Sequence, residues 1–99
     1  MFLSISQFAV ASDLDNSVRE AFVHRAHRVE SAPGFIRMEV ANPTQDAKSF
    51  WLLTWWDKAE SFDSWHRSHE FKASHSAIPK GLKLDPTRTS LLRLNVFAK

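Results

Sequence analysis

The stretch that decides the fold is "SFWLLTWW", residues 49–56. As an extended strand it is apolar on both faces, with Phe50, Leu52 and Trp56 on one and Trp51, Leu53 and Trp55 on the other. Burying one tryptophan removes roughly 150–250 Å² from water. At about 25 cal/mol per Å², that burial is favourable by on the order of 4–6 kcal/mol. We therefore expect both faces of this strand to be covered.

Three other segments alternate apolar and polar residues, the pattern of a half-buried strand. In the first of them, Ser6 and Gln7 necessarily point to opposite faces. The segments are "FLSISQFAV" (2–10), "FIRMEVANP" (35–43) and "SLLRLNVFAK" (90–99).

Two capping boxes, Ser12 with Asp15 and Asp57 with Glu60, predict where two helices begin. Apolar residues at three- and four-residue steps predict that the first helix continues to about residue 31, where "SAPGF" (31–35) ends it. The second helix is expected to reach about residue 75, and a loop follows over residues 77–89.

The order of elements is strand, helix, strand, strand, helix, strand. It predicts a single α+β domain over residues 1–99, a ferredoxin-like βαββαβ antiparallel sheet with two helices on one face. Helices on one face leave the other side of the 49–56 strand uncovered. We therefore expect a homodimer in which that face meets a second copy by twofold symmetry.

Composition excludes several classes of protein. The 99 residues are 43% hydrophobic and 24% charged with a net charge of +2, which is typical of one globular domain and gives no basic patch for nucleic acid. The absence of cysteine excludes a disulfide scaffold and a thiolate metal site. No apolar run approaches the roughly 18 residues of a membrane span, and the first residues lack a positively charged start. A cytoplasmic protein is expected.

The candidate chemistry lies in "SWHRSHEFKASHS" (64–76), which holds three of the five histidines. Two H-x-x-H pairs, His24 with His27 and His66 with His69, have spacing that suits zinc. Each pair encloses an arginine that repels a cation, so no free metal site is expected. No motif of a serine or cysteine nucleophile is present, and helix capping accounts for most of the carboxylates.

Helical phase places Trp65 and His69 on one stripe. On a straight helix His75 would lie about 15 Å from Trp65 along the axis. Helical phase alone therefore favours His69 as the partner of Trp65. The plainer alternative is that Trp65, with Phe62 and Phe71, forms the core face of this helix.

Two longer segments carry a family resemblance: "FVHRAHRVESAPGFIRMEV" (22–40) and "FWLLTWWDKAESFDSWHRSHEFKASH" (50–75). They resemble the antibiotic biosynthesis monooxygenase (ABM) superfamily, and within it the IsdG-type heme-degrading monooxygenases. The most specific parts are "ESAPGF", "TWWDKAESFDSW" and "FKASH". The resemblance covers nearly the whole chain and implies a dimeric ferredoxin-like α+β barrel.

The resemblance also implies site residues. The histidine closing "FKASH", His75, corresponds to the axial ligand of heme iron. Trp65 corresponds to the tryptophan that lies against the porphyrin and helps to pucker it, and Phe22 to a phenylalanine that lines the pocket. A helix broken before His75 would weaken the phase argument for His69.

The sequence departs from the family on the first strand, where members carry an asparagine that donates a hydrogen bond beside the distal oxygen. Gln7 or Ser6 takes that place, depending on a one-residue shift of the alignment. Either substitution is compatible with binding heme without degrading it efficiently. In the loop, Lys80, Lys83 and Arg88 are candidates to meet the heme propionates or are solvated loop charges.

The resemblance implies a heme-degrading monooxygenase that opens the porphyrin ring and releases iron. Heme would be both substrate and cofactor, an external donor such as a reductase would supply electrons, and no flavin would be needed. Two alternatives stay open: a cofactor-independent monooxygenase of an aromatic polyketide-like substrate, and a non-catalytic heme-binding dimer.

Overall fold

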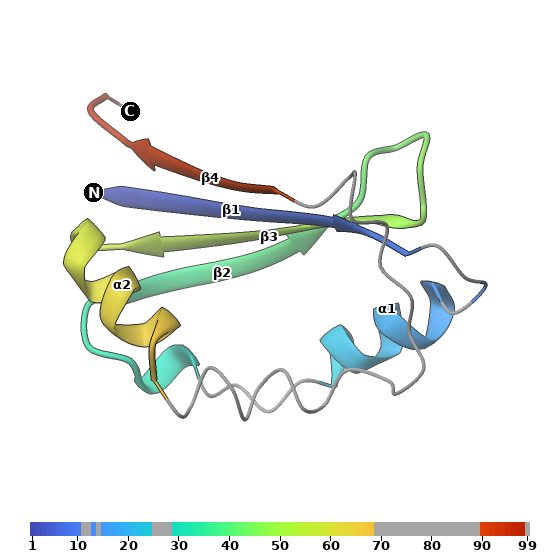
Figure 1. The fold of residues 1–99 in the computed structure, drawn as a ribbon, viewed down its shortest axis with the longest axis horizontal. Coiled ribbons are helices and arrows are strands. Elements are labelled where there is room, and N and C mark those ends of the chain that lie inside the picture. The colour runs from blue at the N-terminus through green and yellow to red at the C-terminus, as the bar shows by residue number, and fades with distance from the viewer. Residues whose placement is uncertain (11–12, 14, 25–28, 69–89, 99) are drawn as a thin grey trace.

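Four strands pair into one antiparallel sheet in the order β2-β3-β1-β4 (Figure 1). The computed structural model describes residues 1–10, 13, 15–24, 29–68 and 90–98. Its elements follow the predicted order: β1 (Phe2–Ala9), α1 (Asp15–Val23), a 3₁₀ helix (Val29–Ser31), β2 (Phe35–Ala41), β3 (Ser49–Trp56), α2 (Ala59–His66) and β4 (Ser90–Asn95). The ferredoxin-like arrangement expected from the sequence is confirmed.

Both helices lie against the same side of the sheet (Figure 1), which we call the helix side; the other is the open side. On the helix side the core forms two clusters of buried residues. Under α1 the cluster is Val10, Val18 and Phe50, and under α2 it is Phe2, Val29, Trp56 and Phe62.

Strand register assigns each side chain to a side, since residues directly opposite in an antiparallel pair share a face. β1 pairs with β3 through Ser6 opposite Leu52 and Gln7 opposite Trp51. Phe2, four residues before Ser6, and Phe8, two residues after it, contact Phe62 and Phe22 of the helices. Even-numbered positions of β1 and β3 therefore face the helix side, and odd-numbered ones face the open side.

The open side is broadly apolar, as the two-faced pattern of β3 predicts. Its rows across the sheet run Arg37, Trp55, Leu3, Leu94; then Glu39, Leu53, Ile5, Leu92; then Ala41, Trp51, Gln7, Ser90. Trp51 is 37% exposed and Leu92 is 44% exposed. The guanidinium of Arg37 lies 4.0 Å from the centre of the Trp55 ring, which partly shields one edge of this surface.

The predicted helix boundaries were partly wrong. α1 ends at Val23, and the last predicted turn, Val29–Ser31, is 3₁₀ helix. α2 ends at His66, with Arg67 as its C-cap.

The predicted capping box at α2 was also wrong. Lys58 is the N-cap and makes no side-chain capping bond. Asp57 instead accepts a hydrogen bond from the Ser61 hydroxyl at 2.6 Å. Its backbone N–H donates to the Gly34 carbonyl at 2.8 Å, so the residue ties α2 to the turn that precedes β2. The first capping box includes Ser12, which lies outside the described residues.

Within the described residues, no helix has the length and apolar character to cross a membrane.

Candidate active site

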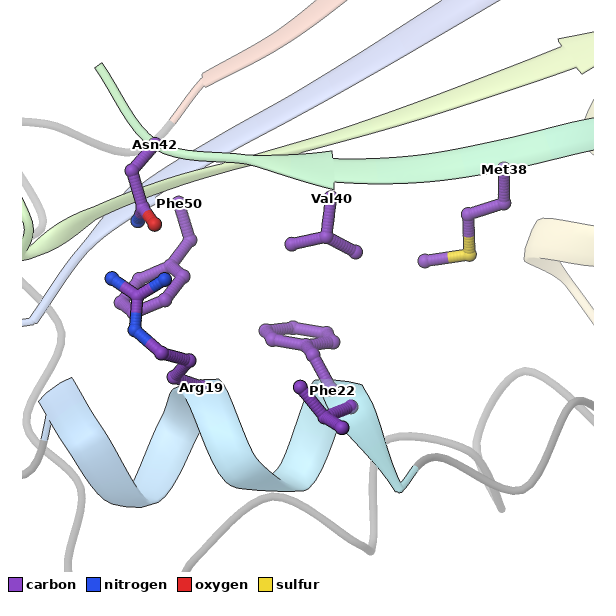
Figure 2. A pocket seen from close by; sticks show the side chains of 7 residues that line it. Arg19, Phe22, Met38, Val40, Asn42 and Phe50 are labelled. Carbon is purple, nitrogen blue, oxygen red and sulfur yellow. The ribbon is translucent and has the colours of Figure 1, made fainter. Parts of the chain in front are cut away.

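A cavity of about 260 Å³ lies on the helix side between α1 and the strands β2 and β3 (Figure 2). Phe22 projects from α1 toward Val40 of β2, with Met38 further along the same strand (Figure 2). The described residues that line it are Arg19, Phe22, Val23, Met38, Val40, Asn42 and Phe50. Most of them are apolar, which suits a hydrophobic ligand held by few polar groups.

Aromatic packing fixes the position of Phe22. Its ring centre lies 6.1 Å from that of Phe8 and 6.1 Å from that of Phe50, and the last two rings stack at 5.6 Å. Val18, one turn earlier on α1, is fully buried and holds the helix against the sheet. The resulting aromatic cluster forms a wall that is set before any ligand arrives.

Trp65 comes to the same side of the sheet from α2. It packs, half-buried, against the core cluster of Phe2, Val29, Trp56 and Phe62, and Met38 packs against that cluster as well. Because Met38 also lines the cavity, it connects the region of Phe22 to the region of Trp65. Trp65 itself does not line the cavity, and Met38 is the residue shared by the cavity at Phe22 and the core cluster on which Trp65 packs.

Phe62 anchors α2, one turn before Trp65. Its ring lies 5.6 Å from Phe2 and 5.8 Å from Trp56. The prediction that Phe62 belongs to the core face of this helix is confirmed, since it is 5% exposed. Trp65 packs on the edge of that core and is only half-buried.

The register separates the two candidates on β1. Ser6 lies on the helix side, in the row that runs Val40, Leu52, Ser6, Leu91 across the sheet. Val40 of this row lines the cavity. Gln7 lies on the open side opposite Trp51, and its Oε1 accepts a hydrogen bond from the Ser90 hydroxyl at 3.2 Å.

His75 lies outside the described residues, as do His69, Lys80, Lys83 and Arg88. His66 is described: it ends α2, its side chain is exposed, and its ring centre lies 5.4 Å from that of Phe62. No group of three potential metal ligands is found in the described part of the chain.

Of the described residues that line the cavity, sequence reasoning singled out only Phe22 as a site residue and missed the other six: Arg19, Val23, Met38, Val40, Asn42 and Phe50. Arg19 precedes Phe22 by three residues, and residues three apart share a helix face. Met38 and Val40 alternate on β2 with the charged Arg37 and Glu39. The helical and strand periods could therefore have pointed to Arg19, Met38, Val40 and also Phe50, which shares a strand face with Leu52. No such pattern marked Val23, at the end of α1, or Asn42, just beyond β2.

Two carboxyl groups of the α2 region have a shifted pKa. A hydrogen bond from Ser61 is the largest cause that lowers the pKa of Asp57 below its ordinary value of 3.8. A hydrogen bond from Arg93 is the largest cause that lowers the pKa of Asp63 below 3.8. Both groups are thus ionised at neutral pH, and neither lines the cavity.

Comparison with known proteins agrees with this architecture. The chain is 28% identical over 96 residues to the mycobilin-producing heme oxygenase of Mycobacterium tuberculosis, covering 95% of this chain and 87% of that protein. It superposes with a TM-score of 0.75 and 25% identity on the heme-degrader MhuD of Mycobacterium tuberculosis with two hemes bound in its active site, over 100% of this chain and 98% of that one.

The same fold also serves other chemistry. SnoaB, a cofactor-independent oxygenase from Streptomyces nogalater, superposes with a TM-score of 0.77 at 14% identity, over 99% of this chain and 94% of that one, a likeness of fold alone. The model of the family described as antibiotic biosynthesis monooxygenase matches residues 1–77. With strand order, helix placement and family match in agreement, the chain belongs to the antibiotic biosynthesis monooxygenase family, whose members are monooxygenase-like enzymes.

Proposed function

We propose that this protein is a heme-degrading monooxygenase that opens the porphyrin ring oxidatively and releases iron. The observation that carries the proposal is the apolar cavity at Phe22, with Met38 connecting it to the core cluster on which Trp65 packs. Its support from relatives is the 28% identity to a mycobilin-producing heme oxygenase over nearly the whole chain.

The described residues fit a flat apolar macrocycle. Phe22, Val40 and Met38 offer apolar surface that excludes water, and Trp65 offers a half-buried indole on the core cluster against which Met38 also packs. When bound, heme supplies the iron at which oxygen is activated. The protein's part is to hold the ring, keep it dry and favour its distorted form, and we assign the last of these to Trp65.

We assign His75 as the axial ligand of the heme iron. A neutral imidazole is a common proximal ligand of heme iron. The assignment rests on the resemblance of "FKASH" to the ligand segment of the family. An external reductase or chemical reductant would supply the electrons.

Ser6 is the better candidate for the distal hydrogen-bond donor, because it lies on the helix side in the row of Val40. Its hydroxyl is shorter than the amide of asparagine, so the donor would sit further from the ligand. We therefore expect slower ring opening than an asparagine at this position would give.

Ser6 in place of an asparagine also favours a second function, a heme-binding dimer that does not degrade its ligand. Such a protein would need the apolar walls and the axial histidine, but no well-placed distal donor. The two functions differ in turnover, not in binding.

We further propose that two copies join through their open sides. The apolar side chains of Trp51, Leu53, Ile5 and Leu92 provide the surface, and burying them removes an exposed hydrophobic patch from water. The isologous contact of a twofold dimer suits such a sheet face.

A two-step titration tests the proposal. Hemin is added to the protein, and the absorbance of the bound heme is recorded; a reductant is then added in air. Degradation predicts saturable binding near one heme per chain, followed by bleaching of the heme absorption band. Binding without bleaching would select the storage or sensing dimer. No binding would select a cofactor-independent oxygenase.

Trp65→Ala provides the matched variant for this titration, with His66→Ala as its neighbour control. Without the indole the bound ring relaxes, so we expect bleaching to slow more than binding weakens. Equal loss of both, or loss of neither, would contradict the role given to Trp65.

A further inference from the structure

The cavity has one charged group at one end. Of the described residues that line it, only Arg19 carries a charge. Figure 2 shows its guanidinium beside Phe50 and Asn42, at the end of the cavity away from Met38. The cavity is thus asymmetric: a cation stands at one end, and an apolar surface runs from Phe22 and Val40 toward Met38.

No ion-pair partner of Arg19 is found among the described residues. Asp13 pairs with Lys48 at 3.2 Å, and Glu20 pairs with His24 at 3.4 Å. Asp15, one turn before Arg19 in the described helix α1, forms no ion pair with it. The guanidinium of Arg19 lies 6.0 Å from the centre of the Phe50 ring, a contact that leaves its charge uncompensated.

Asn42 cannot neutralise that charge. Its Nδ2 donates to the backbone carbonyl of Ser49 at 2.6 Å, which fixes the carboxamide at the end of β2. Phe50 is buried behind the guanidinium. The positive charge therefore lies over an aromatic ring and beside a neutral amide, at one end of an apolar cavity.

We propose that Arg19 receives an anionic group of the ligand and so sets the direction in which the ligand lies. A guanidinium presents a planar fork of donors that matches a carboxylate, with two hydrogen bonds in the best geometry. The apolar body of the ligand then lies along Phe22, Val40 and Met38. Resting on the proposed function, the anionic group is one of the two propionates of heme.

Arg19 thereby acts as a determinant of ligand specificity and orientation. A ligand that is equally apolar but lacks the anion would bind less tightly and without a fixed direction. The test needs ligands that differ only in charge, and variants of Arg19 that keep or remove its charge.

Fluorescent probes test the charge preference without heme. 1-Anilinonaphthalene-8-sulfonate and N-phenyl-1-naphthylamine share an aromatic skeleton, but only the first carries an anion. Arg19→Met keeps an unbranched apolar stem and removes the charge, and Arg19→Lys keeps the charge. Lys58→Met, at the exposed start of α2, removes one charge away from the cavity.

Arg19→Met is expected to weaken binding of the anionic probe by roughly three- to tenfold, the range for a partly exposed charged hydrogen bond. Its affinity for the neutral probe should not change. Arg19→Lys should restore most of the loss, and Lys58→Met should match wild type. An unchanged affinity for the anionic probe in Arg19→Met, or an equal loss of affinity for both probes, would overturn the inference.

The same variants, titrated with hemin and hemin dimethyl ester, separate this inference from the proposed function. We expect wild type to prefer hemin over its ester and Arg19→Met to lose that preference. If wild type binds hemin but Arg19→Met keeps the preference, Arg19 has no orienting role and the proposed function stands. If wild type binds no hemin yet the probes still discriminate by charge, the proposed function fails and the anion site stands.

Discussion

The guanidinium of Arg93 on β4 forms two hydrogen bonds with the carboxylate of Asp63 on α2, at 2.7 and 3.2 Å. It also lies 5.1 Å from the centre of the Phe2 ring and 5.8 Å from that of Phe62. This pairing joins the edge strand of the sheet to the helix that carries Trp65. Through these contacts Arg93 helps to hold α2 against the sheet.

Acid should weaken this link. Because the pKa of Asp63 is lowered by the hydrogen bond from Arg93, the pair stabilises the fold fully above the ordinary value of 3.8 and loses its effect as the pH falls below it. We therefore expect wild type to have a higher melting temperature than Asp63→Asn at pH 7, and the two melting temperatures to converge as the pH falls below 3.8. Melting temperatures measured over this range check it. A constant difference across the range would contradict the link.

Gly34 should not tolerate a side chain. Its φ of +85° is a left-handed conformation, and a Cβ there would collide with the Asp57 carboxylate and the Ser61 side chain. Gly34→Ala is expected to lower the free energy of unfolding by about 1–3 kcal/mol. Urea denaturation measures the change, with Gln45→Ala at an exposed turn as the control. A loss no greater than that of the control would show that the turn adapts.

Ser6 and Gln7 give opposite predictions, because they face opposite sides of the sheet. Ser6→Asn supplies an amide donor on the helix side and is expected to speed heme degradation on the order of tenfold, a modest part of what one well-placed donor contributes. Gln7→Asn should leave the rate unchanged. Single-turnover bleaching of bound heme compares the two. Acceleration by Gln7→Asn alone would reverse the assignment of the donor.

Leu53 lies at the centre of the open side, between Ile5 and Glu39 in its row. A charge placed there would be buried by a twofold contact, so Leu53→Lys is expected to yield monomers where wild type yields dimers. Sedimentation equilibrium at micromolar protein measures the mass. Ser17→Lys, on the exposed face of α1, is the matched control. A wild-type mass of about 11.4 kDa would exclude the dimer.

The order of elements was predictable because strand and helix periods are distinct along most of this chain. The strand 49–56 was predicted to the residue, since "SFWLLTWW" has turn residues before it and a charged pair after it. Helix ends were less predictable. Asp57 and Glu60 have the spacing of a capping box, yet Asp57 bonds to Ser61 because the Gly34 turn fixes its backbone.

The site was predictable only in part. Phe22 was identified by resemblance, and the structure adds Arg19 from the same helix face. Sequence periodicity could not decide whether Ser6 or Gln7 faces the site. Alternation defines two faces of the strand but does not say which one the helices cover. That answer needs the contacts of Phe2 and Phe8 with Phe62 and Phe22.

Ferrous iron released from hemin-loaded protein, in air with a reductant, tests the central claim most directly. Wild type is expected to release close to one iron per bound heme as the heme absorption band disappears. His66→Ala and His69→Ala should do the same, whereas His75→Ala should shift the ferric spectrum, bind heme more weakly and release almost no iron. Intact heme in the wild-type reaction, or loss of the ligand spectrum in His69→Ala with normal turnover in His75→Ala, would contradict the account.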